Sequence, residues 1–537
     1  RKESSAASDV YKRQSMNTKE ILIKLKDAII NNALDAGDVP VNDIKEALIA
    51  EYTVAIGKDT FEYNRLFNYC SLIPDTGLNK NETISFIDRM INYSIEISNH
   101  TSVNTPELPD NIDPYEQYQT YLELSEHYET ANINQYYLCL ENAYFHCKDA
   151  KTKQKIHDKM TAVKNSDHVT VKPVSIVIVS YNCVYLMQKC IESIRNYCYK
   201  PSYEIIVVDN ASTDGVTDWL EQQPDIILIK SNTNLGFPKG CNIGILNSKK
   251  ENDIFLLNND TRLTPNSLFW LRMGLYKDEE TGATGAICNY NGTLQYRELF
   301  FTALDDYIRY GYMNNVPMKN AYEECTILCG FAMMLKRQAL DKTNLLDENL
   351  SPGYYDDDDI SMQLRKLGYR LYVCHNSFIY HAGSQSFGVL PSDSILNICS
   401  RNRDYIWKKW GFDPLNNSIG NIFKMIYATE EPLALLEINA HNGASYAHLS
   451  YICPKLKYVG YESNLSYIPL TIKEARITYT DYDNIDFCQY NKEFNYIIIN
   501  NATEYSEAER NSLYARLYGC LKADGQLIWN DNTPHND

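Results

Sequence analysis

Four short apolar runs between Val174 and Asp260, separated by helix-compatible segments, constrain the fold more than any other feature of the chain. The runs read SIVIVS, EIIVVD, IILIK and IFLLN and occupy residues 175–180, 204–209, 226–230 and 254–258. Strands that are buried on both faces are continuously apolar, and helices connect parallel neighbours. The alternation therefore predicts an α/β domain with a central, mostly parallel sheet.

Polar residues and glycines follow each of the four runs. Ligands of parallel sheets bind beyond the carboxyl ends of the strands, so we expect a binding site at this edge. Glycine there lets the backbone approach a ligand closely. The predicted ligand-binding residues are Ser180, Tyr181 and Asn182 after the first run, Asp209, Asn210, Ser212 and Asp214 after the second, Gly236, Phe237, Gly240 and Asn242 after the third, and Asn258 and Asn259 after the fourth.

A carboxylate, Asp260, closes the polar cluster after the fourth run. Mg²⁺ and Mn²⁺ prefer oxygen ligands and usually share them with substrate phosphates. A carboxylate at this place in the sheet is therefore expected to hold a cation that is bound to a diphosphate.

Six motifs in order resemble the family 2 glycosyltransferases, and most of all the branch described as rhamnosyltransferase-like. They read SIVIVSYN, IIVVDNASTDG, NLGFPKGCN, FLLNNDT, GYYDDDDISMQLRKLGYRL and YHAGSQS, and the resemblance extends from Val174 to Gly411. It implies the nucleotide-sugar-binding fold called GT-A, inversion at the anomeric carbon, and a hexosyl- or rhamnosyltransferase activity.

The resemblance also implies which residues hold the donor, a nucleotide-diphosphate sugar. Asp209 would contact its nucleoside part, with Ser180 and Asn182 nearby. Asp260 occupies the last position of the family's Asp-x-Asp metal motif. His381 matches a histidine that helps to bind the metal or the diphosphate, and the metal would be Mn²⁺ or Mg²⁺.

The acidic run Asp356–Asp359 is expected to supply the general base. By the resemblance, Asp356 and Asp357 form the family's acidic dyad, and Asp357 is the base that removes the acceptor's proton. A helix predicted to begin here favours the ionised carboxylate, whereas adjacent like charges raise one another's pKa. The alternative for the run is a solvated, helix-capping cluster. The metal motif departs from the family because Asn258 stands where many members have the first Asp.

Helical patterns precede this region and a second α/β pattern follows it. We predict a non-native or disordered leader at 1–15, an α-helical domain at 16–168, the GT-A domain at 172–412, a linker at 413–429, and a partial methyltransferase-like domain at 430–537. The helical segments from Tyr115 to Tyr128 and from Tyr136 to Cys147 resemble a tetratricopeptide-type hairpin. Both a partner-binding scaffold and a plain helical bundle remain open for them.

The last part of the chain resembles the front of the class I methyltransferase fold. It carries the runs LALLEI, KYVGYE, FNYIII and GQLIW, and Glu462 fits the acidic residue that binds the cofactor's ribose. The glycine-rich loop of that family keeps only Gly443, and Asn439 stands at its start. We therefore predict a Rossmann-like, degenerate and inactive domain that serves structure or acceptor binding.

The charge and composition of the chain exclude some classes of binding partner. The net charge of −18 argues against broad nucleic-acid binding, which needs a basic face. No segment is long and apolar enough to span a membrane or to act as a signal peptide. The 15 cysteines lack CxxC spacing and are expected to be reduced, buried thiols of a cytoplasmic protein.

The aromatic and basic segment Arg401–Trp410 suggests peripheral contact with the inner face of the plasma membrane, whereas a helix that packs its tryptophans inward is the more usual explanation.

Three functions remain in competition. The first is a metal-dependent, inverting glycosyltransferase that acts on a glycan, a lipid-linked glycan or a protein. The second is a non-catalytic, nucleotide-sugar-binding scaffold, which has no need of a base such as Asp357. The third is a bifunctional glycosyltransferase and methyltransferase, which would bind S-adenosylmethionine through its C-terminal domain.

Overall fold

The computed structural model describes residues 18–55, single positions between 66 and 91, and 117–165, 168–290, 294–299, 301, 303–383, 392–417, 419 and 422–530. The predicted leader at 1–15 and the last three residues of the motif YHAGSQS lie outside the described residues. The chain forms two compact units. One comprises residues 1–108 with 298–306, and the other comprises residues 109–297 with 307–537.

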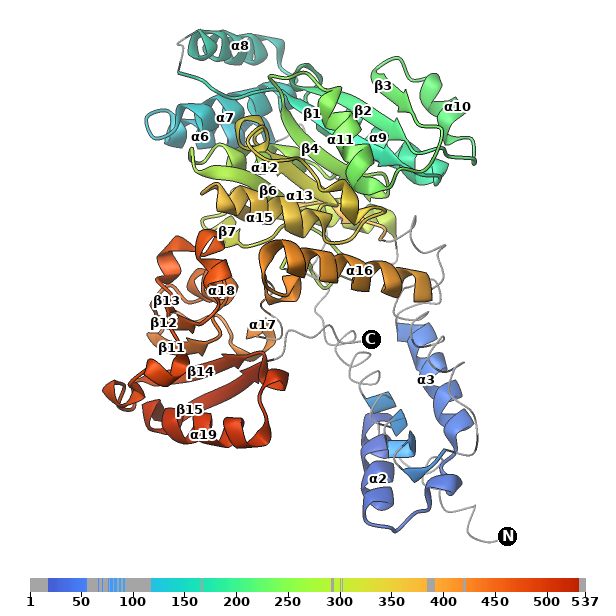
Figure 1. Cartoon of the computed structure of the whole chain (residues 1–537). Coiled ribbons are helices and arrows are strands. Elements are labelled where there is room, and N and C mark those ends of the chain that lie inside the picture. Colours follow the sequence, from blue (N-terminus) through green and yellow to red (C-terminus); the bar gives the residue numbers. More distant parts are fainter. Residues whose placement is uncertain are drawn as a thin grey trace. The chain divides into compact units, whose positions relative to one another are not determined.

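The first unit is helical where it is described. It contains α2 (Thr18–Ile30), the short 3₁₀ helix η1 (Ala36–Asp38) and α3 (Val41–Ala55) (Figure 1). Leu22, Leu25 and Ile29 recur at helical spacing and are buried together with Ile44 and Leu48 of α3. Each helix therefore hides one apolar stripe in a small core.

The second unit contains a large sheet with the strand order β3-β2-β1-β4-β8-β6-β9-β7. Its strands are β1 (Val174–Ser180), β2 (Tyr203–Asp209), β3 (Ile226–Lys230), β4 (Asp253–Asn258), β6 (Thr281–Ile287), β7 (Tyr322–Cys325), β8 (Ala332–Leu335) and β9 (Arg370–Phe378). The four runs predicted from sequence are β1 to β4, and these strands are parallel. Beyond them the sheet is mixed, because β8 is antiparallel to β4 and β6, and β7 is antiparallel to β9.

Helices cover both faces of this sheet (Figure 1). The helices that pack against it are α9 (Val184–Tyr197), α10 (Val216–Glu221), α11 (Phe237–Leu246), α12 (Ser267–Leu275) and α15 (Asp356–Lys366). Further helices in this part of the chain are α13 (Leu304–Asn314), α14 (Arg337–Leu340) and α16 (Ser392–Trp410). Helix α11 lies close against β1 because two of its residues lack a side chain. A Cβ on Gly240 would lie 2.9 Å from Val179, and one on Gly244 would lie 2.3 Å from Val177.

Three further helices belong to the second unit, so the helical domain predicted at 16–168 is divided. They are α6 (Tyr118–Tyr128), α7 (Ile133–His146) and α8 (Ala150–Lys164). Glu141 of α7 forms a buried ion pair with Arg272 of α12, and the Gln135 side-chain amide donates to the Met273 carbonyl at 2.9 Å. Leu138 and Leu140 join the apolar core of the large sheet. The predicted hairpin of α6 and α7 therefore packs on the sheet domain.

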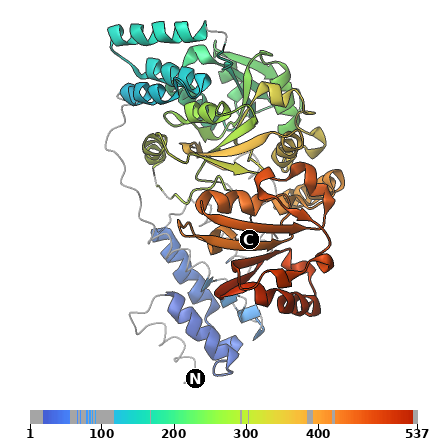
Figure 2. The ribbon, with the colours of Figure 1, turned by 90° about the vertical axis from the view of Figure 1, so that its left-hand side faces the viewer.

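The end of the chain forms a second sheet with the order β13-β12-β11-β14-β15, in which every neighbouring pair is parallel (Figure 2). Its elements are β11 (Leu433–Ile438), α18 (Ala444–Ile452), β12 (Leu456–Glu462), β13 (Thr478–Tyr479), β14 (Phe494–Asn500), α19 (Glu507–Leu517) and β15 (Leu521–Asn530), with α17 (Ile422–Met425) before them. The order places the topological switch of a doubly wound sheet between β11 and β14. We call residues 430–530 the C-terminal domain.

Within the described residues, no helix has both the length and the apolar character that crossing a membrane requires.

Candidate active site

A cavity of about 310 Å³ opens at the carboxyl edge of the large sheet. It is lined from three directions: by the end of β4, by the segment before β8, and by the start of α15 together with α16. The lining residues are Phe237, Asn258, Cys329, Gly330, Phe331, Gly353, Tyr354, Tyr355, Asp356, Asp357, Asp358, His381 and Cys399. The cavity therefore brings the predicted acidic dyad and the predicted histidine to one place.

The acidic residues enter the cavity on a strained turn. Tyr354 and Tyr355 have φ angles of 72° and 66°, in the left-handed region that bulky residues rarely adopt. The side-chain amide of buried Asn402 on α16 holds this turn, because it donates to the carbonyls of Leu350 at 2.8 Å and Gly353 at 2.9 Å. Backbone strain that is fixed in this way is typical of functional sites.

Asp357 is oriented by two backbone N–H groups. Gly330 donates to its Oδ2 at 2.9 Å, and Asp358 donates to its Oδ1 at 3.1 Å. Burial raises the pKa of Asp357 above its ordinary value, against the lowering effect of these hydrogen bonds. Burial and the charge of Asp357 raise the pKa values of Asp356 and Asp358 further. A group of this kind can hold a proton at a higher pH than an ordinary carboxylate.

Asp359 has a different environment from the other three aspartates. It is fully buried and accepts hydrogen bonds from Gln363 Nε2 and Trp410 Nε1, both at 2.8 Å. Lys409 Nζ lies 2.8 Å from its Oδ1. Asp359 therefore links the first turn of α15 to the end of α16. The other three aspartates of the acidic run line the cavity.

Asp260 and His381 lie side by side, although they are far apart in the sequence. A two-stranded ribbon joins them, because β10 (Tyr380–His381) pairs with β5 (Thr261–Arg262). His381 Nε2 lies 3.3 Å from Asp260 Oδ1, and neither atom is used in a well-aligned hydrogen bond. The His381 Nδ1–H group donates to the Tyr290 carbonyl at 3.0 Å, so Nε2 is the nitrogen directed at Asp260.

Several neighbours act on His381. Burial is the largest single effect and lowers the pKa of His381, but the charge of Asp260, its contact with the ring and the neighbouring Cys288 together raise that pKa to about 10. Both side chains are at most one-tenth exposed. Among the described residues, no group of three or more His, Cys, Asp or Glu side chains is arranged to bind a metal ion. The pair thus offers the Asp260 carboxylate and His381 Nε2 as candidate ligands.

Three unsatisfied polar atoms lie at the ends of β1 and β2. Ser180 Oγ, Asp209 Oδ1 and Asn210 Oδ1 are buried and have no hydrogen-bond partner. The other Asp209 oxygen accepts from Thr217 Oγ1 at 2.8 Å. Buried polar groups without partners are costly, so a cluster of them marks a place for a ligand or ordered water.

The turns after β1 and β2 bind each other. Asn182 N–H donates to Ser212 Oγ at 2.8 Å, and Asp214 Oδ2 accepts from Val184 N–H at 2.8 Å. Asn259 Nδ2 donates to the Asn182 carbonyl at 3.4 Å. These side chains therefore shape the loops around the strand ends. Tyr181 is half-buried beside them.

The predicted residues after β3 have three different surroundings. Gly236 has φ +82°, and a Cβ on it would lie 2.8 Å from Pro352, so only glycine fits where this loop meets the turn before α15. Phe237 lines the cavity. Gly240 and Asn242, which were predicted to bind the donor, make packing contacts in the structure. Gly240 abuts Val179, and the Asn242 amide donates to the Leu346 carbonyl at 2.9 Å.

Tyr290 and Asn402 are among the contributors to the site that were not predicted. Tyr290 orients His381 through a backbone carbonyl, which has no side-chain signature in a sequence. Asn402 falls within the aromatic and basic segment, where its role in holding the turn at Gly353 is hidden among charged neighbours. The two tryptophans of that segment differ in their surroundings. Trp410 points inward and donates a hydrogen bond to Asp359, whereas Trp407 is 58% exposed.

Comparison with known proteins gives a family match for part of the chain. Residues 175–343 match the model of the family described as Glycosyl transferase family 2. The glucosyltransferase WfaP of Escherichia coli, named UDP-Glc:alpha-D-GlcNAc-diphosphoundecaprenol beta-1,3-glucosyltransferase, is 26% identical over 228 residues, which cover 40% of this chain and 79% of WfaP. The uncharacterized protein y4gI of Sinorhizobium fredii is 22% identical over 252 residues, 44% of this chain and only 27% of that protein.

Solved structures also match parts of the chain at low identity. Mannosyltransferase PcManGT from Pyrobaculum calidifontis, in complex with GDP-Man and Mn²⁺, is 20% identical with a TM-score of 0.31, over 40% of this chain and 58% of its own. GalNAc-T7 with UDP, GalNAc and Mn²⁺ is 13% identical with a TM-score of 0.32, over 43% and 52%. S. aureus TarS 1–349 is 14% identical with a TM-score of 0.29, over 45% and 72%.

Proposed function

We propose that the family 2 glycosyltransferase domain of this chain transfers a sugar, with inversion, from a nucleotide-diphosphate sugar to an acceptor hydroxyl. The observation that best supports the proposal is the cavity itself, because Asp357, Asn258 and His381 all line it. The acceptor is a glycan, a lipid-linked glycan or a protein. The name of the E. coli relative makes UDP-glucose and a diphosphate-linked lipid the first pair to test.

The buried polar atoms without hydrogen-bond partners at the ends of β1 and β2 suit the binding of the donor. Asp209 and Asn210 would offer oxygen acceptors to the nucleoside, and Ser180, the last residue of β1, lies beside Asp209 of β2. Asp260 and His381 would hold a divalent cation, and the donor's phosphates would complete its ligands. Such a cation, when bound, neutralises charge on the departing nucleoside diphosphate.

Asp357 would act on the acceptor. As the acceptor oxygen forms its bond to the anomeric carbon, the bond to the diphosphate oxygen breaks on the opposite face, and the acceptor's proton passes to Asp357. The N–H groups of Gly330 and Asp358 fix the carboxylate in one orientation, which a base within hydrogen-bond reach requires. The strained turn at Tyr354 and Tyr355 and its clamp, Asn402, set the position of this helix end.

Substitution of Asp260 tests the donor site. Titration calorimetry with UDP-, dTDP- and GDP-linked sugars should show binding of one donor that strengthens with Mn²⁺. Asp260→Ala should weaken that metal-dependent binding at least about tenfold, because one of two protein ligands is lost. Asp218→Ala, an exposed carboxylate on α10, is the matched control and should bind as the wild type does. Failure of every donor to bind with any metal would remove the basis of the proposal.

The rate should depend on pH in the way that a base with a raised pKa dictates. The pKa of Asp357 is raised by burial, and only its ionised form accepts a proton. The rate therefore rises as pH rises through this pKa, and the acidic limb of the kcat/KM profile lies above the ordinary carboxylate value of about 4. Asp358→Asn should leave this limb nearly in place, because the pKa of Asp358 is raised further than that of Asp357 and its carboxyl group is still protonated where Asp357 ionises. A rate that falls with rising pH over the same range would contradict Asp357 as the base.

A further inference from the structure

The C-terminal domain shares an apolar core with the acidic helix. Met362 of α15 and Ile406 of α16 are buried in one cluster with Tyr467 and Leu470. The last two residues lie on the 3₁₀ helix η6 (Leu465–Leu470) of the C-terminal domain. The face of α15 that turns away from the cavity is therefore covered in part by another domain.

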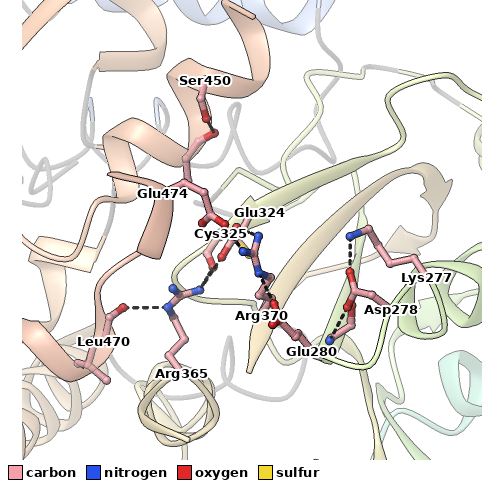
Figure 3. A network of polar contacts seen from close by, with 12 residues as sticks. Lys277, Asp278, Glu280, Glu324, Cys325, Arg365, Arg370, Ser450, Leu470 and Glu474 are labelled. Carbon is pink, nitrogen blue, oxygen red and sulfur yellow. Dashed lines mark hydrogen bonds and ion pairs between the residues drawn. The ribbon is translucent and has the colours of Figure 1, made fainter. Parts of the chain in front are cut away.

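Polar contacts fasten the far end of the same helix. Arg365, near the last residue of α15, is buried, and its Nε–H donates to the Leu470 carbonyl at 2.9 Å. Its Nη1 donates to Glu324 Oε1 at 3.1 Å (Figure 3). The guanidinium thus links α15 to β7 on one side and to the C-terminal domain on the other.

A neighbouring arginine connects the same two domains through ion pairs with residues outside α15. Arg370 begins β9, and its side chain pairs with Glu280 and Glu324, both at 3.1 Å, and with Glu474 of the C-terminal domain (Figure 3). It is about one-quarter exposed, whereas Arg365 is 6% exposed. The two arginines therefore share Glu324 but differ in whether they hold the acidic helix.

A second line of hydrogen bonds starts from the loop after β11. Asn442 Nδ2 donates to Asn417 Oδ1 at 2.6 Å, and Asn417 Nδ2 donates to Met362 Sδ at 3.5 Å. The Asn417 carbonyl accepts from Thr326 Oγ1 at 2.8 Å. Thr326 lies shortly before Gly330, whose N–H donates to Asp357. The loop therefore reaches both α15 and the segment that orients its carboxylate.

That loop lies at the edge where doubly wound sheets usually bind ligands. Here the edge is occupied by the chain's own side chains. Tyr482 Oη and Tyr505 Oη bond the Asn439 side chain, and the ring of Tyr467 packs on His441 with centroids 5.4 Å apart. Glu462, predicted to bind a ribose, accepts backbone N–H groups of His441, Ser463 and Asn464, each at 2.8 Å.

We infer that the C-terminal domain positions the catalytic carboxylate: it docks its strand-end loop and η6 on α15 and, through Arg365, holds Asp357 in register with the cavity. The inference rests on the proposed function of Asp357. Arg365 lies about 12 Å along the helix axis from Asp357, at about 1.5 Å per residue, and acts through the rigid helix between them. It is a positioning residue, because it touches neither donor nor acceptor.

The test compares Arg365→Ala with Arg370→Ala in the full chain. The assay is nucleotide release from whichever of the UDP-, dTDP- and GDP-linked sugars binds the wild type, with Mn²⁺ and with water as acceptor. Arg365→Ala should lower kcat tenfold or more and leave donor Kd within twofold, and Arg365→Lys should recover part of the loss. Arg370→Ala should leave kcat within twofold. Equal losses of kcat in the two alanine variants, or no loss in Arg365→Ala, would overturn the inference.

Hydrogen exchange separates this inference from the proposed function, because it needs no substrate. Arg365→Ala should speed exchange of the α15 amides at least tenfold more than Arg370→Ala does. If Arg365→Ala does not fold, Asn442→Ala takes its place and should speed the same amides and lower kcat by a smaller factor. Unchanged exchange in α15 refutes the positioning role. A wild type that binds no donor refutes the proposed function alone.

Discussion

Asp357→Asn should lower the rate of sugar transfer by about 10²–10⁴-fold while donor binding stays within a factor of about two, because loss of a general base costs this much and no more. Asparagine keeps the volume of the side chain, and its oxygen can still accept the Gly330 N–H that now holds Oδ2 at 2.9 Å. What it cannot do is take the acceptor's proton. The measurement is single-turnover transfer alongside calorimetric donor binding.

Asp358→Asn is the matched control, since it makes the same change one residue further along the same cavity wall. At neutral pH it should cost less than about tenfold, because Asp358 is not the family's base position. A larger loss in Asp358→Asn than in Asp357→Asn would transfer the role of base to Asp358. Loss of donor binding in Asp357→Asn would instead show that this carboxylate belongs to the donor site.

The parts of the site that follow strands were predictable, and the parts assembled by tertiary contacts were not. Burial on both faces makes β1, β2 and β4 continuous apolar runs, and the direction of parallel strands then brings Ser180, Asp209 and Asn258 to one edge. The second half of the sheet is mixed and has short strands such as β7 and β8, which leave a weaker pattern.

The place of His381 in the site could not be predicted from residue spacing. Nothing in residue spacing links it to Asp260, and only the pairing of β5 with β10 brings the two to 3.3 Å. The resemblance predicted that Asp260 and His381 both bind the metal. That role stays a prediction. Residue spacing also cannot distinguish the cavity residue Asp357 from Asp359, which anchors the helix. The partners of Asp359, Lys409 and Trp410, lie on another helix.

Glycine and asparagine after a strand can serve either ligand binding or packing. Both residues suit turns and close approaches, but a helix that lies tight against a strand needs glycine for the same steric reason. Gly240 abuts Val179, and Asn242 closes the loop at Leu346. The sequence carries the residue type and not the neighbour, so the ligand and packing explanations cannot be separated before the fold is known.

Arg272→Met should lower the free energy of unfolding of the sheet domain by about 3–5 kcal/mol, because it leaves the Glu141 carboxylate buried without its partner. The pair is 7% exposed on both sides and joins α12 to α7, so its loss tests whether α7 is part of this domain's core. Urea unfolding followed by tryptophan fluorescence would report the change, since buried Trp270 lies on α12.

Two comparisons make that result interpretable. Lys230→Met breaks an ion pair with Glu221 whose side chains are about half exposed, and it should leave the free energy of unfolding almost unchanged. The double variant Arg272→Met with Glu141→Met removes both charges and should recover most of the loss, because an apolar pair of similar volume replaces a buried ion pair at little cost. If Arg272→Met costs no more than Lys230→Met, α7 contributes a surface contact only. The helical segment would then be an appended module, as its resemblance to a tetratricopeptide-type hairpin suggested.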